Sequence, residues 1–336
     1  MKLGTWGIVL IVAAITSIAS VGGTALYYNI MAHLNIPIRE KLVVATTTSL
    51  FDTGLLDEVE VQFEAKHNID LYFVSVGTGI AIQFAQRGDA DMILVHSPSN
   101  ELTFLEGGYG VNRKIIAYNF FEIVGPQGDS AQITGLSPTE ALSKIVVAGR
   151  SSQTQWVSRG DNSGTHSKEK ELWSAAGFDW AEIRDELGWF VETGSGMGNT
   201  LKTANQLQAY TLTDIGTFLA YSEADPSLIP NLARLVTQGE ELLNVYSAIV
   251  VNQTLHSQIN FEGAVTFIKY LVSEEGQQIV GEYGTAQYTQ SLFYPAVDIL
   301  KTNADPTIAQ MIRNYAFFES SECPSKYRYG HPELYS

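Results

Sequence analysis

The stretch LVVATTTSL at residues 42–50 joins a strand-like apolar run to a cluster of hydroxyl-bearing residues just before a helix-like stretch. The same arrangement occurs in LYFVSVGTG at 71–79, TQWVSRGDNSGT at 154–165 and WFVETGSGMG at 189–198. At such junctions the first N–H groups of a helix have no partner within it, and Ser and Thr hydroxyls add donors. A single junction is equally explained by a residue that caps its own helix, but four in one chain predict a pocket of neutral donors for an anion.

Strands and helices are expected to alternate from residue 41 onward. Apolar runs at 42–45, 71–76 and 92–95 predict strands, and the apolar spacing at 54–66 and 80–87 predicts helices between them. Within 54–66 the alternation Val59, Val61, Phe63 is also compatible with a strand. A β-α-β-α-β pattern predicts an α/β fold with a parallel sheet and right-handed crossovers.

Two longer β-rich runs, at 115–124 and 245–251, predict crossings between two α/β lobes and therefore a two-stranded hinge. Ligands of open α/β sheets sit at the carboxyl ends of strands, so a cleft between the lobes is the expected site. The expected divisions are an N-terminal membrane or signal segment with a linker at 1–40, lobe 1 at 41–124 plus 250–320, lobe 2 at 125–249, and a tail at 321–336.

The composition excludes several classes of protein. The 336 residues include 36 acidic and 20 basic ones, for a net charge of −16, and no basic stripe with interleaved aromatics is present, which argues against nucleic acid. The acidity opposes anion capture only at long range, because salt screens charges beyond about 8–10 Å. Cys323 is the single cysteine and the six histidines have no metal-ligand spacing, so neither a disulfide framework nor a metal site is expected.

The N-terminal segment is predicted to meet the membrane. No charged residue occurs at 3–32, and the run from Trp6 to Tyr28 exceeds the roughly 20 apolar residues that span a bilayer. Lys2 favours a cytoplasmic amino terminus, and the apolar stretch is longer than a usual signal core, which favours an uncleaved anchor. A cleaved signal peptide is the alternative, with Ser17-Ile18-Ala19 as a small-residue cleavage site. Either interpretation places the folded part outside the cytoplasm, secreted or periplasmic if the segment is cleaved.

The third junction carries the clearest anion chemistry. Arg159 is the obvious cation within the four junctions, and Asp161 is placed to hold its guanidinium while leaving other N–H groups for a ligand. Ser163, Gly164 and Thr165 add hydroxyl and backbone donors, with the glycine allowing close approach. The alternative is an ordinary surface ion pair beside a helix cap.

The other junctions contribute further candidates. Thr48 and Ser49 are hydroxyl donors at the first helix start, Gly77 and Thr78 lie at the second, and Gly196 offers a backbone N–H at the fourth. Gly196 is equally explained by a tight strand-to-helix turn.

An enzyme is the main alternative from another class. A hydrolase or transferase would pair Ser163 or Ser195 with His166, the local histidine. No Gly-x-Ser-x-Gly nucleophile elbow occurs, and His166 is expected to face away from the helix start. A ligand-sensing domain is a third possibility, although no output module is visible after residue 320. We therefore expect a binding protein and no enzyme.

The sequence resembles a known family over residues 41–320. Arg159–Thr165 is similar to the Arg-x-Asp-x-Ser-Gly-Thr loop of phosphate receptors, and the wider set resembles the TupA-type tungstate-binding proteins of tungstate ABC importers. The motifs that carry the wider resemblance are Thr46–Ser49 with Thr53–Leu56, Val76–Gly79, Gly88–Asp91, Val95–Pro98, Ser158–Thr165, Gly194–Gly198 and Tyr210–Asp214.

The resemblance implies a type II periplasmic-binding fold that holds an oxyanion between two lobes and delivers it to ABC permease and ATPase subunits. It implies a monomer without a cofactor whose ligand is tungstate or molybdate. The ligand contacts that it implies are Thr48, Ser49, Thr78, Ser158, Arg159, Ser163, Gly164 and Thr165. The family often has His-Ala-Pro where this chain has His96-Ser97-Pro98, a mild change that is expected to lie outside the site. Many relatives also have a cleaved signal instead of an anchor.

Charge chemistry favours a fully deprotonated anion. Phosphate is partly protonated at neutral pH and profits from a carboxylate acceptor, whereas tungstate, molybdate and sulfate are repelled by one. Apart from Asp161, the junctions offer only Asp52 and Glu192. Size and charge alone do not rank tungstate above molybdate.

Overall fold

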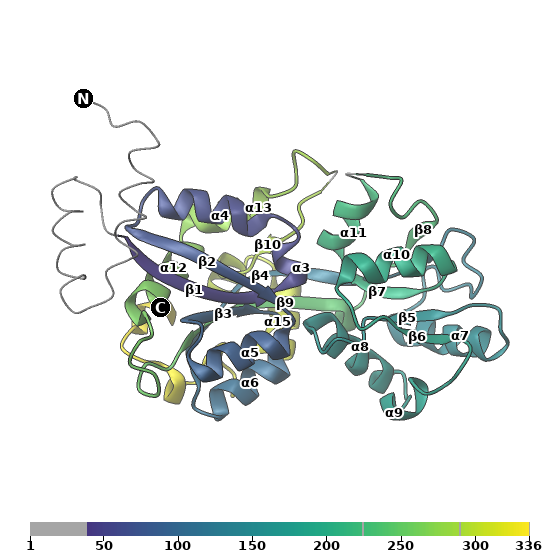
Figure 1. Cartoon of the computed structure of the whole chain (residues 1–336), viewed down its shortest axis with the longest axis horizontal. Coiled ribbons are helices and arrows are strands. Elements are labelled where there is room, and N and C mark those ends of the chain that lie inside the picture. The colour runs from purple at the N-terminus through teal and green to yellow at the C-terminus, as the bar shows by residue number, and fades with distance from the viewer. Residues whose placement is uncertain (1–38, 224, 289, 336) are drawn as a thin grey trace, which may run out of the picture.

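Two lobes lie side by side in the computed structural model, which describes residues 39–335 except 224 and 289 (Figure 1). The first lobe begins with β1 (Glu40–Thr47), α3 (Thr48–Phe51), α4 (Leu55–Glu64), β2 (Ile69–Val76), α5 (Thr78–Arg87), β3 (Met92–Val95) and α6 (Pro98–Glu106). The long strand β4 (Gly110–Pro126) then enters the second lobe. These elements confirm the predicted alternation of strands and helices. Within the segment 54–66, where a helix and a strand were both compatible with the sequence, the structure has the helix α4.

The second lobe is built from the middle of the chain. Its elements are α7 (Pro138–Arg150), β5 (Trp156–Ser158), α8 (Gly164–Ala175), α9 (Trp180–Ile183), β6 (Phe190–Glu192), α10 (Met197–Leu207), β7 (Thr211–Asp214), α11 (Ile215–Ser222) and β8 (Leu232–Val236). The chain then completes the first lobe with η1 (Glu240–Leu242), β9 (Leu243–Val251), α12 (Phe261–Leu271), α13 (Glu274–Glu282), β10 (Tyr294–Pro295), α14 (Val297–Thr302), α15 (Pro306–Ala316), η2 (Ser325–Tyr327) and η3 (Pro332–Tyr335).

The first-lobe sheet has the strand order β10-β4-β9-β3-β1-β2. Strand β1 is parallel to β2 and β3, whereas β9 is antiparallel to β3 and β4. Figure 1 shows α4 and α13 on one side of this sheet and α5 and α6 on the other. Since helices cover both faces, all four residues of β3 are apolar and buried.

The second lobe has an aromatic core. Part of β4 pairs antiparallel with β7 and β8, and β5 pairs in parallel with β6. Trp173 of α8 packs against the rings of Trp156, Trp189 and Phe190. This packing fixes the carboxyl end of β5 and the start of α8, which are the two ends of the third junction.

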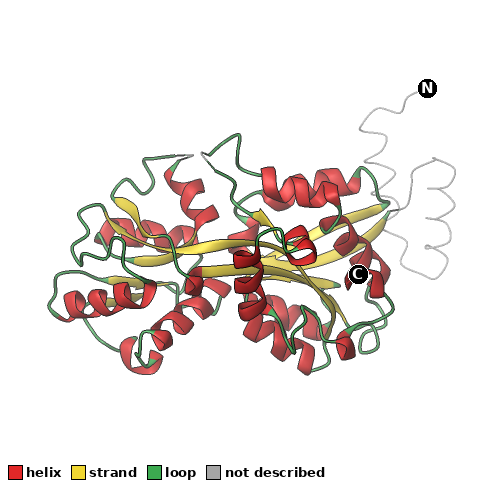
Figure 2. Ribbon diagram, turned by 180° about the vertical axis from the view of Figure 1, so that it is seen from behind, coloured by secondary structure: helices red, strands yellow, loops and turns green. Residues whose placement is uncertain are grey.

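The lobe boundary differs from the expected one on the return path. Strand β4 crosses as predicted, because residues 110–120 pair with β9 and residues 121–126 pair with β7 and β8. Strand β9, expected to be a crossing largely inside lobe 2, pairs with β3 and with the first-lobe part of β4. The chain therefore returns to the first lobe before residue 243. The sequence shows that β9 is a strand but not which strand it pairs with. Figure 2 shows the strands passing between the lobes with helices packed around them.

The expected tail is part of the first lobe. Arg113 Nη1 donates to the carbonyl of Glu322 at 2.6 Å, Tyr335 donates its hydroxyl to the carbonyl of Arg113 at 3.2 Å, and Cys323 is fully buried. Arg113 itself is fully buried and forms an ion pair with Glu101 at 2.7 Å. The polar, turn-rich composition of 321–336 did not reveal this packing, because the partner side chains come from β4.

The predicted N-terminal anchor or signal segment lies outside the described residues, apart from the start of β1. Over residues 39–335, leaving out 224 and 289, no helix is both long and apolar enough to cross a bilayer.

Candidate functional site at the lobe interface

Two junctions of the first lobe bring hydroxyl groups to the lobe interface. Thr47 caps α3 by accepting a hydrogen bond from the Leu50 N–H at 3.3 Å, which leaves Thr48 as the first helical residue. Thr78 follows Gly77 at the start of α5 and is fully buried. Both junctions lie at the carboxyl ends of neighbouring parallel strands, as the sequence predicts.

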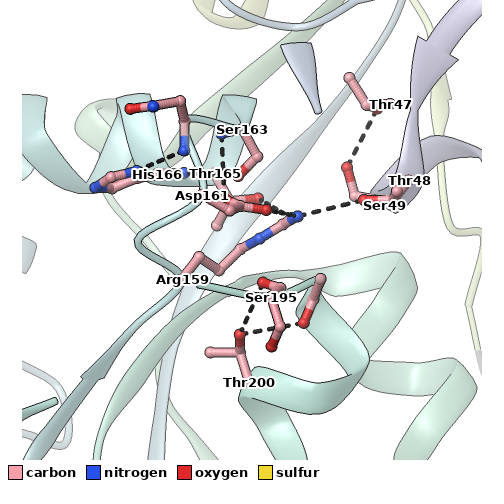
Figure 3. A network of polar contacts seen from close by, with 12 residues as sticks. Thr47, Thr48, Ser49, Arg159, Asp161, Ser163, Thr165, His166, Ser195 and Thr200 are labelled. Carbon is pink, nitrogen blue, oxygen red and sulfur yellow. Dashed lines mark hydrogen bonds and ion pairs between the residues drawn. The ribbon is translucent and has the colours of Figure 1, made fainter. Parts of the chain in front are cut away.

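The third junction brings a buried arginine to the same place. Arg159 is 2% exposed, and its Nη2 donates to Asp161 Oδ2 at 2.6 Å, which confirms the predicted pairing. The same Nη2 lies 3.3 Å from Thr48 Oγ1, and Nη1 lies 3.4 Å from Thr165 Oγ1. The contact with Thr48 joins the two lobes, as Figure 3 shows. Arg159 therefore lies at the point where three of the predicted site residues meet.

Two buried donors at the lobe interface have no partner among the described residues, and their junctions face each other, since a Cβ on Gly77 would lie 3.6 Å from the carbonyl oxygen of Asp161. Thr78 Oγ1 and Arg159 Nε are buried, and the described part of the chain provides no hydrogen-bond partner for either. Thr48 and Thr165 accept from Arg159, so their own hydroxyl hydrogens are not used in that contact. Because buried polar groups are normally hydrogen-bonded, a convergence of unused donors fits an anionic ligand.

Two predicted donors use their hydroxyl hydrogens elsewhere. Asn244 Nδ2 donates to Asn119 and Tyr246, so its Oδ1 is the acceptor for His96 Nδ1–H at 2.9 Å. The His96 Nε2 then accepts the Ser49 hydroxyl at 3.1 Å. Burial lowers the pKa of His96 to about 4, which keeps the ring neutral at physiological pH. The hydroxyl hydrogen of Ser49 is therefore committed to His96.

Ser158 is committed in the same way. Its hydroxyl donates to Glu169 Oε2 at 2.8 Å, and Glu169 Oε1 accepts the indole N–H groups of Trp156 at 2.7 Å and Trp173 at 3.3 Å. Burial raises the pKa of Glu169 to about 7. Neither His96 nor Glu169 was among the candidates from the sequence. The position of His96, directly after the buried strand β3, was the available signal.

Gly164 packs against the other lobe. It is the first residue of α8, and a Cβ at this position would lie 2.6 Å from Cε1 of His96. His96 therefore lies at the lobe interface, beside the start of α8. Ser163 caps α8 by accepting the His166 N–H at 3.2 Å.

The fourth junction supports the third. Thr193 Oγ1 lies 3.3 Å from the carbonyl oxygen of Ser158 and 3.2 Å from that of Arg159. Figure 3 shows Ser195, just before α10, in contact with Thr200 of that helix. Gly196 is the N-cap residue of α10, and a Cβ there would meet nothing within 4 Å. No contact between Gly196 and the other predicted site residues is present in the described part of the chain.

The geometry does not assemble a nucleophile and base from Ser163 and His166. The Ser163 oxygen accepts the backbone N–H of His166, and the His166 Nδ1 accepts the backbone N–H of Asn162 at 2.9 Å. The ring of His166 contacts Trp180, with 5.1 Å between the ring centroids. The imidazole is therefore turned toward Trp180 of α9.

Carboxylates around the site are largely engaged. Asp161 is paired with Arg159, and Glu192 with Arg184 at 2.6 Å. Asp214 is buried and caps α11 by accepting from the backbone N–H and hydroxyl of Thr217. Asp52 is exposed at the end of α3. The arrangement presents more donors than free acceptors, which suits a fully deprotonated anion.

Comparison with known proteins identifies the family. A sequence profile of the PBP superfamily domain matches residues 19–275, well over half of the chain. The chain belongs to the PBP superfamily. Its two-lobed α/β architecture is the type II fold of that superfamily, as expected.

Relatives within the superfamily confirm the resemblance to TupA-type proteins. A Haloferax volcanii protein, provisionally named as an ABC transporter anion-binding protein, is 43% identical over 257 residues, covering 76% of this chain and 72% of that protein. The tungstate-binding protein TupA of Peptoclostridium acidaminophilum is 40% identical over 257 residues, covering 76% of this chain and 85% of that protein. The structure of TupA from Desulfovibrio alaskensis G20 has a TM-score of 0.65 at 37% identity, covering 76% of this chain and 98% of that one.

Proposed function

We propose that this PBP-superfamily chain is a solute-binding protein that captures tungstate between its lobes and delivers it to an ABC importer. The observation that carries the proposal is the buried guanidinium of Arg159, which reaches Thr48 across the lobe interface and whose Nε has no hydrogen-bond partner among the described residues. The similarity to proteins named as tungstate-binding supports the choice of anion. The ligand would be held by hydrogen bonds and one cation, with no covalent change.

The donor set would consist of Arg159 together with the hydroxyls of Thr48, Thr78 and Thr165, and backbone N–H groups at the starts of α5 and α8 would complete it. Arginine holds an oxyanion well because its planar fork stays charged and offers several N–H groups. Asp161 would orient the fork and would be too strongly paired to repel the ligand. Molybdate is the alternative ligand, followed by sulfate and phosphate.

Titration calorimetry with tungstate, molybdate, sulfate and phosphate at matched ionic strength tests the function. We expect tight one-to-one binding of tungstate, weaker sulfate and still weaker phosphate. Phosphate binding as tight as tungstate, or no binding of any of the four anions, would refute the assignment.

Arg159→Ala tests the site. Losing charge-assisted hydrogen bonds worth about 1.5–3 kcal/mol each, and exposing the anion to an unpaired Asp161, should weaken tungstate binding by at least about 30-fold. Arg150→Ala is the matched control, because Arg150 also pairs with a carboxylate, Glu186, but on the outer surface of the second lobe. Equal affinities in the two variants would argue against the site.

Location and partners complete the proposal. We propose that the folded lobes act outside the cytoplasm, held at the membrane by the segment before residue 41 or released after its cleavage. The permease and ATPase subunits of an importer would be the partners, and the receptor would act as a monomer. Membrane fractionation of the full chain with N-terminal sequencing distinguishes anchor from signal, and light scattering gives the oligomeric state.

A further inference from the structure

Glu169 is a buried carboxylate without a cation. It lies on α8, five residues after Gly164, and is 2% exposed. Its three contacts are with the Trp156 and Trp173 indoles and with the Ser158 hydroxyl. No lysine, arginine or histidine of the described residues forms an ion pair with it. A charge buried in this way is costly, so the neutral acid competes with the carboxylate near physiological pH.

The charged groups around Glu169 do not neutralise it. On α8, Lys168 is directed to Glu171 at 3.4 Å and to the ring of Tyr315, and the His166 ring faces Trp180. From β6, Glu192 adds a like charge that raises the pKa of Glu169 further, although Arg184 pairs with it. At the end of β5, Arg159 is engaged by Asp161.

The Ser158 hydroxyl has one hydrogen, and the protonation state of Glu169 decides where it goes. When Glu169 is ionised, Ser158 must donate to Oε2, and only its lone pairs remain for other groups. When Oε2 carries a proton, Glu169 can donate to Ser158 Oγ, and the hydrogen of Ser158 is released. Ser158 is the last residue of β5 and directly precedes Arg159, so this change in hydrogen bonding occurs one residue before the cation of the site.

We propose that Glu169 is a positioning residue that takes up a proton when the oxyanion binds. Ser158 then accepts a hydrogen bond from Glu169 and can donate its own hydrogen to the oxyanion. This inference rests on the proposed function, because it concerns the same anion site. The proton comes from solvent, and the only bond formed is the O–H bond on Oε2. A dianion then meets a neutral acid and an additional donor, instead of a buried carboxylate.

The experiment is calorimetric titration with tungstate at pH 6.5, 7.5 and 8.5, each in two buffers of different ionisation enthalpy. The wild type should take up close to one proton per tungstate at pH 8.5 and few at pH 6.5. With the pKa of Glu169 at about 7, affinity should fall by up to roughly 25-fold between pH 6.5 and 8.5. A wild type that binds tungstate with flat affinity and no proton uptake overturns the proposal and leaves the function intact.

Glu169→Gln is the decisive variant. The glutamine Oε1 can accept both indole N–H groups while Nε2 donates to Ser158, so the side chain imitates the protonated acid. We expect near-wild-type affinity at pH 6.5, tighter binding than wild type at pH 8.5, and no proton uptake. Proton uptake that persists in this variant refutes the role of Glu169. No binding of tungstate by the wild type at any pH would instead refute the proposed function.

Two further variants separate the relay from its neighbours. Burial lowers the pKa of Lys168 to about 8, so this lysine is a competing group for proton uptake. Lys168→Gln is the control, and we expect proton uptake on tungstate binding to persist in this variant. Loss of uptake in Lys168→Gln and its survival in Glu169→Gln would overturn the assignment. Ser158→Ala should weaken tungstate binding more at pH 6.5 than at pH 8.5, because at pH 8.5 the gain from the Ser158 donor in the wild type is offset by the cost of protonating Glu169. An equal loss at both pH values would point to a purely structural role.

Discussion

The replacement Gly164→Ala tests whether the lobes must meet for the ligand to bind. The added Cβ would lie 2.6 Å from His96 Cε1 and 2.9 Å from both ring nitrogens. Non-bonded carbon atoms prefer separations of about 3.5–4.0 Å, so either the ring or the second lobe must move by about 1 Å. The ring cannot move freely, because Ser49 and Asn244 hold its two nitrogens and Tyr246 packs against it at 4.8 Å between centroids.

The size of the effect follows from this contact. Overpacking of a tight contact costs about 1–3 kcal/mol, which corresponds to roughly 5- to 150-fold in the dissociation constant for tungstate. The clash exists only when the lobes are together. The mutation should therefore change the melting temperature of the ligand-free protein less than it changes the increase in melting temperature that tungstate produces. Alanine also has a higher helix propensity than glycine at the first residue of α8, which works against any loss of stability.

The assay is calorimetry with tungstate together with thermal unfolding at zero and saturating ligand. Gly196→Ala is the matched control, since Gly196 also lies at a helix start of the second lobe, its φ of −62° suits alanine, and its Cβ meets nothing within 4 Å. The control should bind tungstate within about twofold of wild type, well below the 1.4 kcal/mol that makes a tenfold change. If Gly164→Ala also binds within twofold, the contact between His96 and Gly164 is not part of the ligand-bound state.

Two predictions concern stability. Glu101→Gln leaves the fully buried Arg113 guanidinium without its carboxylate, so the free energy of unfolding in urea should fall by about 3–5 kcal/mol, whereas Glu319→Gln, which removes an ion pair between the exposed Glu319 and Lys326, should change it little; equal midpoints would contradict the reasoning. The pKa of buried His96 is lowered to about 4 from 6.5, so the unfolded chain takes up its proton first, and this contribution to stability is complete above pH 6.5 and is lost as the pH falls toward 4. Thermal melts from pH 7 to 4 should therefore show a decline that is smaller in His96→Gln, and an unchanged slope in that variant would assign the decline to other groups.

Much of the fold could be read from local sequence signals. The alternation of apolar runs and helical spacing over 42–95 gave the parallel strands and their helices, because helix and strand periodicity depend on neighbours in sequence. The start of α7 is likewise set locally, by a capping box between Ser137 and Glu140. The pairing of β9 and the docking of residues 321–335 depend on contacts with β3 and β4, far away in sequence, and local patterns do not encode them.

The site shows the same division. Arg159 and Asp161 are two residues apart, so their pairing could be predicted, and so could the hydroxyl groups at the helix starts. Ser49 and Ser158 were predicted as donors on equal terms with Thr48 and Thr78. In the structure only the two threonines keep their hydroxyl hydrogens available for a ligand. His96 accepts the hydrogen of Ser49, and Glu169 accepts that of Ser158.

The groups that can bind an anion follow from the sequence: one arginine within the four junctions, a set of hydroxyls at helix starts, and few free carboxylates. Only the tertiary structure decided which of these donors remain available. A hydroxyl has a single hydrogen, and the acceptor that takes it is chosen by proximity in space. For Ser49 that acceptor is itself oriented by Asn244, a residue 195 positions further along the chain.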